Sequence, residues 1–294
     1  MATVPQPAAD PEAGSLLARI DAYCDTAPRG SVPPEDHGPL TLFLPHDGSW
    51  PYYARPTPGH PAPPTAADVA AVRRRQRELG VPEALEWIHE TSPGLAAAAE
   101  HAGMHVHSHP LMALDPDAFA AAPVPAPPDV DVRRIAHDAL DLAIVHSVPA
   151  VAFAEPGTRI GLGGPELRDA AAPGQPVELL RYLGARMRTG ETVTYAAYGA
   201  KGPLATGSHL PRTTPGPAGA LATELVAIGT LPSARRRGLA AAITWHLAAD
   251  ALAGGAALVF LSAGDEDVAR VYGRLGFRRV GTAMIAEGRD EVMP

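Results

Sequence analysis

Residues 224–250, ELVAIGTLPSARRRGLAAAITWHLAAD, contain the pattern that decides the fold. An apolar strand over 225–228 leads through Pro232 to three arginines and Gly238, and a helix follows. A helix that begins after such a loop presents unpaired backbone N–H groups, which bind anions together with the helix dipole. Gly238 allows the backbone to approach the anion closely. The stretch therefore predicts a strand–loop–helix unit that holds a pyrophosphate.

Three consecutive arginines strengthen this prediction, because guanidinium groups pair well with phosphate oxygens. They are Arg235, Arg236 and Arg237, and the small Ala240 keeps the next turn tight. No Gly-Lys-Ser/Thr follows, and Gly-x-Gly-x-x-Gly is absent, so neither a Walker loop nor a dinucleotide fingerprint is present. The alternative is a solvated basic helix start without a ligand.

The spacing of this loop resembles that of a known family. Arg235-x-x-Gly238-x-Ala240, after a strand and Pro232, is similar to the acyl-CoA loop Gln/Arg-x-x-Gly-x-Gly/Ala of the GNAT (Gcn5-related) N-acetyltransferases. One strand further on, residues 265–277 resemble the GNAT pattern Asn-x-x-Ala-x-x-hydrophobic-Tyr-x-x-x-Gly-Phe.

Three positions of this second pattern match and two depart from it. Tyr272, Gly276 and Phe277 match, whereas Asp265 replaces the Asn and Val268 replaces the small residue. The resemblance covers about residues 129–294. It implies an α/β fold with a mixed sheet, the GNAT acyltransferase fold, and the element order β α α β β β α β α β for this part of the chain.

The chain is predicted to form two GNAT-like domains. Residues 120–128, AAAPVPAPP, have the composition of a linker, so we expect domains over 1–126 and 127–294. The first repeats the order strand, helix, Gly-hydrophobic, strand, and aligning Gly103 with Gly276 places Ala99 opposite Tyr272. We therefore expect a degenerate, non-catalytic GNAT-like domain, and an unrelated α+β cap is the alternative.

The resemblance implies acetyl-CoA as cosubstrate and assigns residues that bind it. The main chain near Gly229, Thr230 and Leu231 would hold the pantetheine arm. Asp265 would bond the cofactor or cap the following helix. The pyrophosphate would lie on the N–H groups of the loop and the helix start, namely Arg235, Arg236, Arg237, Gly238, Leu239 and Ala240.

Acyl transfer also needs an acid for the leaving thiolate and a base for the amine. Tyr272 matches the usual general acid of the family, and a half-buried core tyrosine is the alternative. Glu224 is the candidate general base, because a carboxylate between Ala222 and Leu225 is costly to bury without a task; an outward-facing strand residue is its alternative. His209, on the neighbouring strand, is a weaker candidate base.

Composition excludes several classes of protein. The chain has 294 residues, a formal net charge of −8 and one cysteine, Cys24. An acidic chain argues against nonspecific nucleic-acid binding. The sequence has no signal-peptide pattern and no apolar run long enough to cross a bilayer, so we expect a cytoplasmic protein without membrane contact. His105, His107 and His109 alternate on one strand but diverge too little to surround an ion, so we expect no metal.

We therefore expect an acetyl-CoA-dependent N-acetyltransferase that acetylates a primary amine of a small molecule, possibly an antibiotic or other natural product. Direct transfer in a ternary complex is expected, because Cys24 lies outside the expected catalytic domain. A GNAT-fold acyl-CoA sensor without turnover and a protein lysine acetyltransferase are the alternatives. A monomer or a homodimer is expected.

Overall fold

The computed structural model describes residues 11–44, 52–119, 124–214 and 220–288. Its N-terminal part begins with a long helix and continues with short strands and two further helices. The elements are α1 (Pro11–Arg29), β1 (Pro34–His37), β2 (Leu40–Phe43), β3 (Arg55–Pro56), α2 (Ala66–Leu79), β4 (Ala84–Ile88), α3 (Leu95–His101) and β5 (Met104–Leu114).

The second part of the chain alternates helices with longer strands. Its elements are β6 (Asp131–Arg134), α4 (Leu142–Ala154), α5 (Pro165–Ala171), a 3₁₀ turn (Ala172–Gly174), α6 (Val177–Thr189), β7 (Val193–Gly199), β8 (Gly202–Thr213), β9 (Leu221–Thr230), a 3₁₀ turn (Pro232–Ala234), α7 (Leu239–Ala253), β10 (Leu258–Ser262), α8 (Glu266–Gly273) and β11 (Phe277–Gly288).

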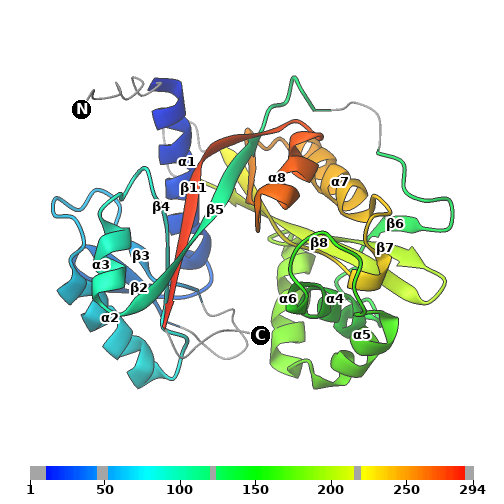
Figure 1. Ribbon diagram of the computed structural model, residues 1–294, viewed down its shortest axis with the longest axis horizontal. Coiled ribbons are helices and arrows are strands. Elements are labelled where there is room, and N and C mark those ends of the chain that lie inside the picture. Colours follow the sequence, from blue (N-terminus) through cyan, green and yellow to red (C-terminus); the bar gives the residue numbers. More distant parts are fainter. Residues whose placement is uncertain (1–10, 45–51, 120–123, 215–219, 289–294) are drawn as a thin grey trace.

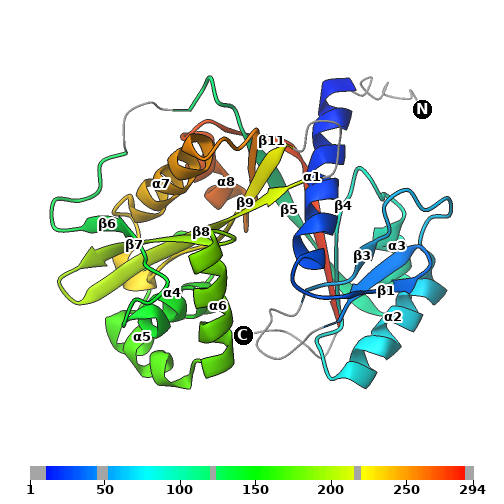
Figure 2. The same ribbon diagram turned by 180° about the vertical axis from the view of Figure 1, so that it is seen from behind.

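Strands from both parts build one mixed sheet. Its order is β4-β11-β5-β10-β9-β8-β7-β6, and β1, β2 and β3 form a separate small sheet. The C-terminal strand β11 lies between β4 and β5 and is antiparallel to both. The long strands β5 and β11 connect a lobe that carries α1, α2 and α3 with a lobe that carries α4 to α8 (Figures 1 and 2).

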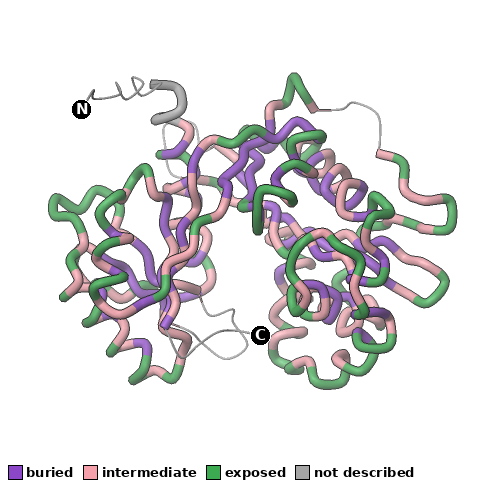
Figure 3. The backbone as a smooth tube through the Cα atoms, in the orientation of Figure 1, coloured by how far each residue is buried: buried purple, intermediate pink, exposed green. Residues whose placement is uncertain are grey.

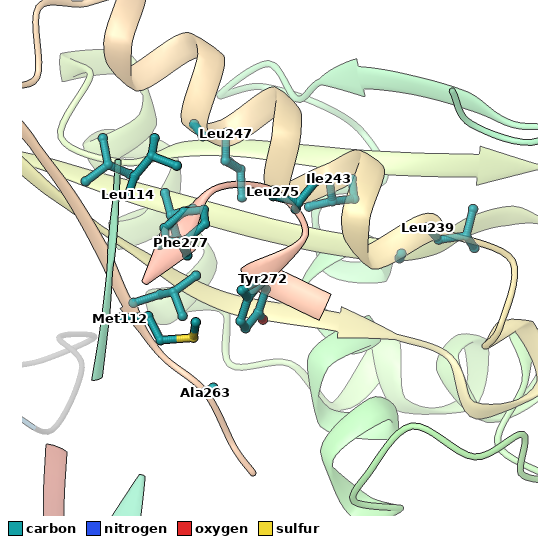
Figure 4. Packing of buried hydrophobic residues seen from close by; sticks show 14 of the residues in the cluster. Met112, Leu114, Leu239, Ile243, Leu247, Ala263, Tyr272, Leu275 and Phe277 are labelled. Carbon is teal, nitrogen blue, oxygen red and sulfur yellow. The ribbon is translucent and has the colours of Figure 1, made fainter. Parts of the chain in front are cut away.

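In the second lobe, helices cover both faces of the sheet. Helices α7 and α8 lie on one face, and α4, α5 and α6 lie on the other (Figure 1). Side chains of α7 and α8 enclose the largest apolar cluster together with the sheet, and buried residues alternate along these two helices with partly buried and exposed ones (Figure 3). Leu239, Ile243 and Leu247 of α7 pack in this cluster with Phe277 (Figure 4). Burying such side chains stabilises the fold by about 1.5–3 kcal/mol each.

Most of the predicted elements of the second part are confirmed, in the predicted order, with one addition. The segment 155–176, predicted as loop, contains helix α5. Pro165 occupies the first turn of α5, where its missing N–H costs nothing. Arg168 fixes the helix to the sheet, because its buried guanidinium donates to the carbonyl oxygens of Lys201 and Pro203. Only tertiary contacts of this kind distinguish the short helix from a loop.

The N-terminal part follows its prediction less closely. Helix α1 runs to Arg29 instead of ending at Cys24. The sequence predicts a hairpin around a turn at 46–48, and β2 does pair with β3. It also pairs with β1, which the sequence pattern did not predict. The turn predicted at 46–48 lies outside the described residues.

The division into domains over 1–126 and 127–294 remains a prediction. Residues 282–288 of β11 pair with β5, and most of them also pair with β4, so the last strand of the second predicted domain contributes to the sheet of the first. The two lobes therefore share one continuous sheet.

Candidate active site

Strands β9 and β10 separate in the middle of the sheet. They are parallel and pair over only three positions, which end at Phe260 opposite Glu224. Beyond Glu224, β9 continues to Thr230 while it remains paired with β8 on its other side. Among the described residues, backbone groups on the β10 side of this stretch have no partner strand, and an unpaired edge of this kind can bind an extended ligand. The opening thus begins at Glu224.

A β-bulge distorts β9 inside this opening. The register against β8 shifts between Thr206 and Ser208, and Ala227 has a positive φ of 53°. Such a φ is uncommon for a residue with a side chain and is held here by the surrounding sheet. After the bulge, each residue of β9 lies on the sheet face opposite to the one that an uninterrupted strand would give it. Leu225 therefore packs in the α7 cluster, whereas a Cβ on Gly229 would meet Ala152 of α4 at 3.0 Å.

The loop after β9 leads directly into the N-terminus of α7. Gly238 caps the helix with a φ of 81°, and the N–H of Ala242 donates to the carbonyl of Gly238. The N–H groups of Leu239 and Ala240 precede this first helical hydrogen bond, so they have no acceptor within the helix. Together with the helix dipole, these are the groups that the predicted anion site would use.

The three arginines of the loop have different surroundings. The guanidinium of Arg235 donates to the carbonyl oxygens of Ala152, Glu155 and Arg159 at the end of α4. Burial lowers the pKa of Arg235. Its side chain therefore secures α4 to the loop and is not directed at a phosphate, which corrects the expectation that all three guanidinium groups add charge to the anion site.

The next two arginines remain near the surface. Arg236 is exposed and has a positive φ of 66°, so its side chain is available to an anion. Arg237 forms an ion pair with Asp129, with N–O distances of 2.9 and 2.8 Å. Because this pair is exposed, a competing phosphate loses little by displacing it.

Glu224 lies partly buried where β9 and β10 part. Removal from solvent and, to a smaller extent, the negative charge of Glu86 raise the pKa of Glu224 to about 8, although Arg55 opposes both effects. The carboxyl group therefore titrates close to neutral pH, which suits a general base. Glu86 and Arg55 come from the other lobe, so both lobes contribute to the electrostatics of this position.

Helix α1 lies close to Glu224. The hydroxyl of Tyr23 donates to the carbonyl of Leu210 at 2.6 Å, and Leu210 is the β8 partner of Glu224. Burial raises the pKa of Tyr23, so its hydroxyl stays neutral. The sequence pattern did not single out Tyr23, because no motif links residues so far apart in the chain.

Tyr272, the candidate acid, is buried on α8. Only 5% of it is exposed, and it packs with Met112, Leu275 and Phe277 (Figure 4). Burial raises the pKa of its hydroxyl, so the proton stays bound at neutral pH. No described residue forms a hydrogen bond with this hydroxyl. The surroundings fit both the acid and the core-tyrosine alternatives.

His209, the weaker candidate base, is enclosed in a separate network. Its Nδ1 lies 3.1 Å from the hydroxyl oxygen of Thr223, and its Nε2 lies 3.1 Å from a carboxylate oxygen of Asp250. Asp250 also accepts a hydrogen bond from Tyr195. Desolvation lowers the pKa of His209 against the effect of Asp250. His209 pairs with Leu225 and shares its α7 face, so the structure separates it from Glu224.

The remaining predicted residues lie at the two ends of the opening. Asp265 caps α8 by accepting the N–H of Val268 at 2.8 Å, as its structural alternative predicted. Leu231 is buried and donates its N–H to the carbonyl of Leu204. The hydroxyl oxygen of Thr230 is buried and lacks a hydrogen-bond partner among the described residues. An orphaned hydroxyl at the end of an unpaired strand edge fits a polar ligand in the opening.

A glycine-rich loop, for which the sequence predicted no role, packs against the loop that carries the three arginines. The carboxylate of Glu155 accepts the N–H groups of Leu162 and Gly163. The N–H of Gly161 donates to Pro232, immediately before the arginines. A Cβ on Gly161 would lie 2.0 Å from a Glu155 oxygen, so a larger residue there would displace this carboxylate from the N–H groups that it accepts. The run GLGG at 161–164 is the sequence feature from which this loop could have been predicted.

Within the described ranges, no three His, Cys, Asp or Glu side chains gather in a way that could hold a metal ion. His109 contacts the carbonyl of Gly264, and His107 lies 3.7 Å from Glu287. No helix among the described residues is long and apolar enough to cross a membrane.

The fold and the opening thus define an α/β protein with parallel strands that part next to the N-terminus of α7. Residues 219–285, from β9 into β11, match the family model of FR47-like proteins. No curated protein matches the chain.

Solved structures resemble the chain over most of its length. A GCN5-related N-acetyltransferase from Kribbella flavida superimposes with a TM-score of 0.64 and 24% identity, over 93% of this chain and 96% of that one. A functionally unknown protein from Staphylococcus epidermidis gives 0.55 and 14%, over 90% and 96%. A tandem GNAT protein from the clavulanic acid biosynthesis pathway gives 0.51 and 18%, over 87% and 79%. The fold is the GNAT fold, which confirms the predicted resemblance.

Proposed function

We propose that this protein is an acetyl-CoA-dependent N-acetyltransferase that acetylates a primary amine of a small molecule. The observation that carries the proposal is the opening between β9 and β10, with Glu224 at its origin and the start of α7 at its end. A strand edge that binds an extended amide chain and a helix start that binds phosphate match the two halves of a coenzyme A molecule.

Each part of the opening would hold a different part of acetyl-CoA. The free backbone edge of β9 near Gly229 and Thr230 would pair with the pantetheine amides. The N–H groups from Arg235 to Ala240 and the exposed Arg236 would bind the pyrophosphate. The bound cosubstrate supplies an acetyl thioester, in which the carbonyl carbon is electrophilic and the thiolate is the leaving group.

The residues around the opening would move the protons of the reaction. Glu224, with its pKa raised to about 8, would accept a proton from the ammonium group of the acceptor, directly or through water. The amine then forms the C–N bond and the C–S bond breaks. Tyr272, which stays protonated because burial raises its pKa, would donate its proton to the thiolate sulfur, and the second proton released by the attacking nitrogen would return to the Tyr272 oxygen, directly or through water. N–H groups at the bulge near Ala227 would stabilise the oxyanion.

The net charge of −8 favours a cationic amine over an anionic acceptor. One structural relative is a tandem GNAT protein from the clavulanic acid biosynthesis pathway, which supports a natural-product amine as one substrate class. We further propose that residues 1–126 form a degenerate GNAT-like domain that closes one side of the site. A cytoplasmic monomer or homodimer without nucleic-acid or membrane contacts is in keeping with this role.

A sensor that binds acyl-CoA without turnover is the second candidate. The observation that favours it is the deep burial of Tyr272 without a hydrogen-bond partner among the described residues. Such burial is equally typical of a tyrosine that serves only the core.

A thiol-release assay with acetyl-CoA and a panel of amines tests the proposal. Glu224→Gln and Tyr272→Phe should abolish or strongly reduce release with the accepted amine, while acetyl-CoA binding by calorimetry stays nearly unchanged. Glu166→Gln and Tyr198→Phe serve as matched controls, because Glu166 is exposed and pairs with Lys201, and Tyr198 donates to Asp141. Binding without release for every amine would favour the sensor.

A further inference from the structure

A second site candidate lies in the first lobe, away from the opening between β9 and β10. A cavity of about 370 Å³ is lined by the loop between β3 and α2, the turn between β4 and α3, and Asp21 of α1. Figure 1 shows these elements together on the lobe that carries α1, α2 and α3. None of the residues proposed to bind acetyl-CoA or to transfer protons lines it.

The wall of this cavity is rich in hydrogen-bond acceptors and poor in donors. Five prolines lie within residues 56–64, and proline has a carbonyl group but no N–H. Several remaining amides are already used: Thr57 donates to Pro39, His60 to Thr57, and Leu95 to Ser92. A ligand that fits this wall must therefore bring donors of its own.

The charge of the cavity also favours a ligand that brings its own hydrogen-bond donors. Asp21 accepts a hydrogen bond from Arg55 at 3.0 Å, and the same guanidinium donates to Glu86 at 3.0 Å. Arg55 is buried, with 2% of its side chain exposed, whereas Asp21 is 24% exposed and faces the cavity. Two carboxylates share one cation, so the group carries an excess negative charge, and Asp21 is the one of the two carboxylates that lines this cavity.

We propose that this cavity binds a small organic ammonium ion, with Asp21 as its anchor. The ammonium group donates to the Asp21 carboxylate in a charge-assisted hydrogen bond. The remaining N–H groups of the ligand meet carbonyl oxygens of the proline loop, and its methylene groups lie against the pyrrolidine rings. The volume falls within the range of small-molecule pockets. No residue that lines this cavity takes part in the proposed acetyl transfer, although Arg55, which pairs with Asp21, also lowers the pKa of Glu224.

Titration of the full chain with 1,4-diaminobutane tests the proposal by calorimetry and by amide chemical shifts. Saturable binding is expected, with the largest shifts at Gly59, His60 and Gly94. The uncharged 1,4-butanediol should not bind. Asp21→Asn should weaken binding at least tenfold, whereas Asp25→Asn, one turn along α1 and paired with Arg29, should leave it unchanged.

Two further variants separate the possible explanations. Ser92→Trp fills the cavity but leaves the Asp21–Arg55–Glu86 group intact, so it should abolish binding even if Asp21→Asn perturbs the fold. Glu224→Gln should bind the diamine normally, which distinguishes this cavity from an acceptor site at the opening. Absence of binding, equal binding of the diol, or binding that survives both Asp21→Asn and Ser92→Trp would overturn the proposal.

Discussion

Replacing Glu224 by glutamine should change how the stability of the protein depends on pH. The folded state raises the pKa of Glu224 from an ordinary value of 4.5 to about 8, chiefly through loss of solvent and then through the charge of Glu86. Between these values the folded protein keeps a proton that the unfolded chain has released. The stability that the protonated Glu224 contributes to the folded state is therefore fully present below about pH 4.5, and it is lost as the pH rises through about 8.

The magnitude follows from the number of protons. One proton retained only by the folded state lowers the free energy of unfolding by about 1.4 kcal/mol per pH unit. From pH 5.5 to pH 7.5, wild type should lose about 2.7 kcal/mol relative to Glu224→Gln. The glutamine has the same shape and no titratable group, so its own stability lacks this dependence.

Urea unfolding of both proteins at pH 5.5, 6.5 and 7.5 measures the difference. Glu166→Gln is the matched control and should stay parallel to wild type, because Glu166 is exposed and its pKa is lowered by Lys201. Glu86→Gln should narrow the pH range over which stability falls, because removal of the neighbouring charge lowers the pKa of Glu224 in the folded state. A constant difference between wild type and Glu224→Gln across this range would refute a protonated, desolvated carboxyl at this position.

Three other substitutions probe the site. Tyr272→Phe should lower kcat at least about 100-fold with little change in acetyl-CoA affinity by calorimetry; an unchanged kcat would exclude the acid role. Arg235→Ala should reduce the free energy of unfolding by about 2–4 kcal/mol, because three carbonyl oxygens lose a charged donor; chemical denaturation at neutral pH checks this, and no loss would contradict it. Gly161→Ala should destabilise the protein by more than about 1 kcal/mol relative to Gly174→Ala, since the added Cβ meets Glu155 only in the first; equal thermal midpoints would contradict the close approach.

The sequence was most informative where local chemistry sets the structure. Gly238 takes the left-handed conformation at the start of α7, Asp265 caps α8, and Phe277 packs beside Tyr272. Each depends on the residue itself and a few neighbours. Spacing along the chain was sufficient to predict the helix start after Gly238 and the cap at Asp265, although not the left-handed φ of Gly238 or the contact of Phe277 with Tyr272. The same applies to the order of the elements after residue 129.

Features that depend on distant partners could not be predicted. Ala227 adopts a positive φ although nothing in its sequence favours one, because pairing with β8 imposes the bulge. Arg235 turns toward α4, because the carbonyl groups at the end of that helix need donors. Glu86 and Arg55 influence Glu224 across about 140 and about 170 residues of sequence, and only the folded sheet brings them near it.

The position of β11 has a consequence for synthesis of the protein. Strands β4 and β5 belong to the first third or so of the chain, yet the strand that joins them ends at residue 288. A ribosome must therefore synthesise residues 115–276 and then β11 before these two strands acquire their shared neighbour. Until then their edges are open to other nascent chains, and contacts between residues so distant in sequence close slowly. The first lobe is thus synthesised before the second lobe but is completed after it.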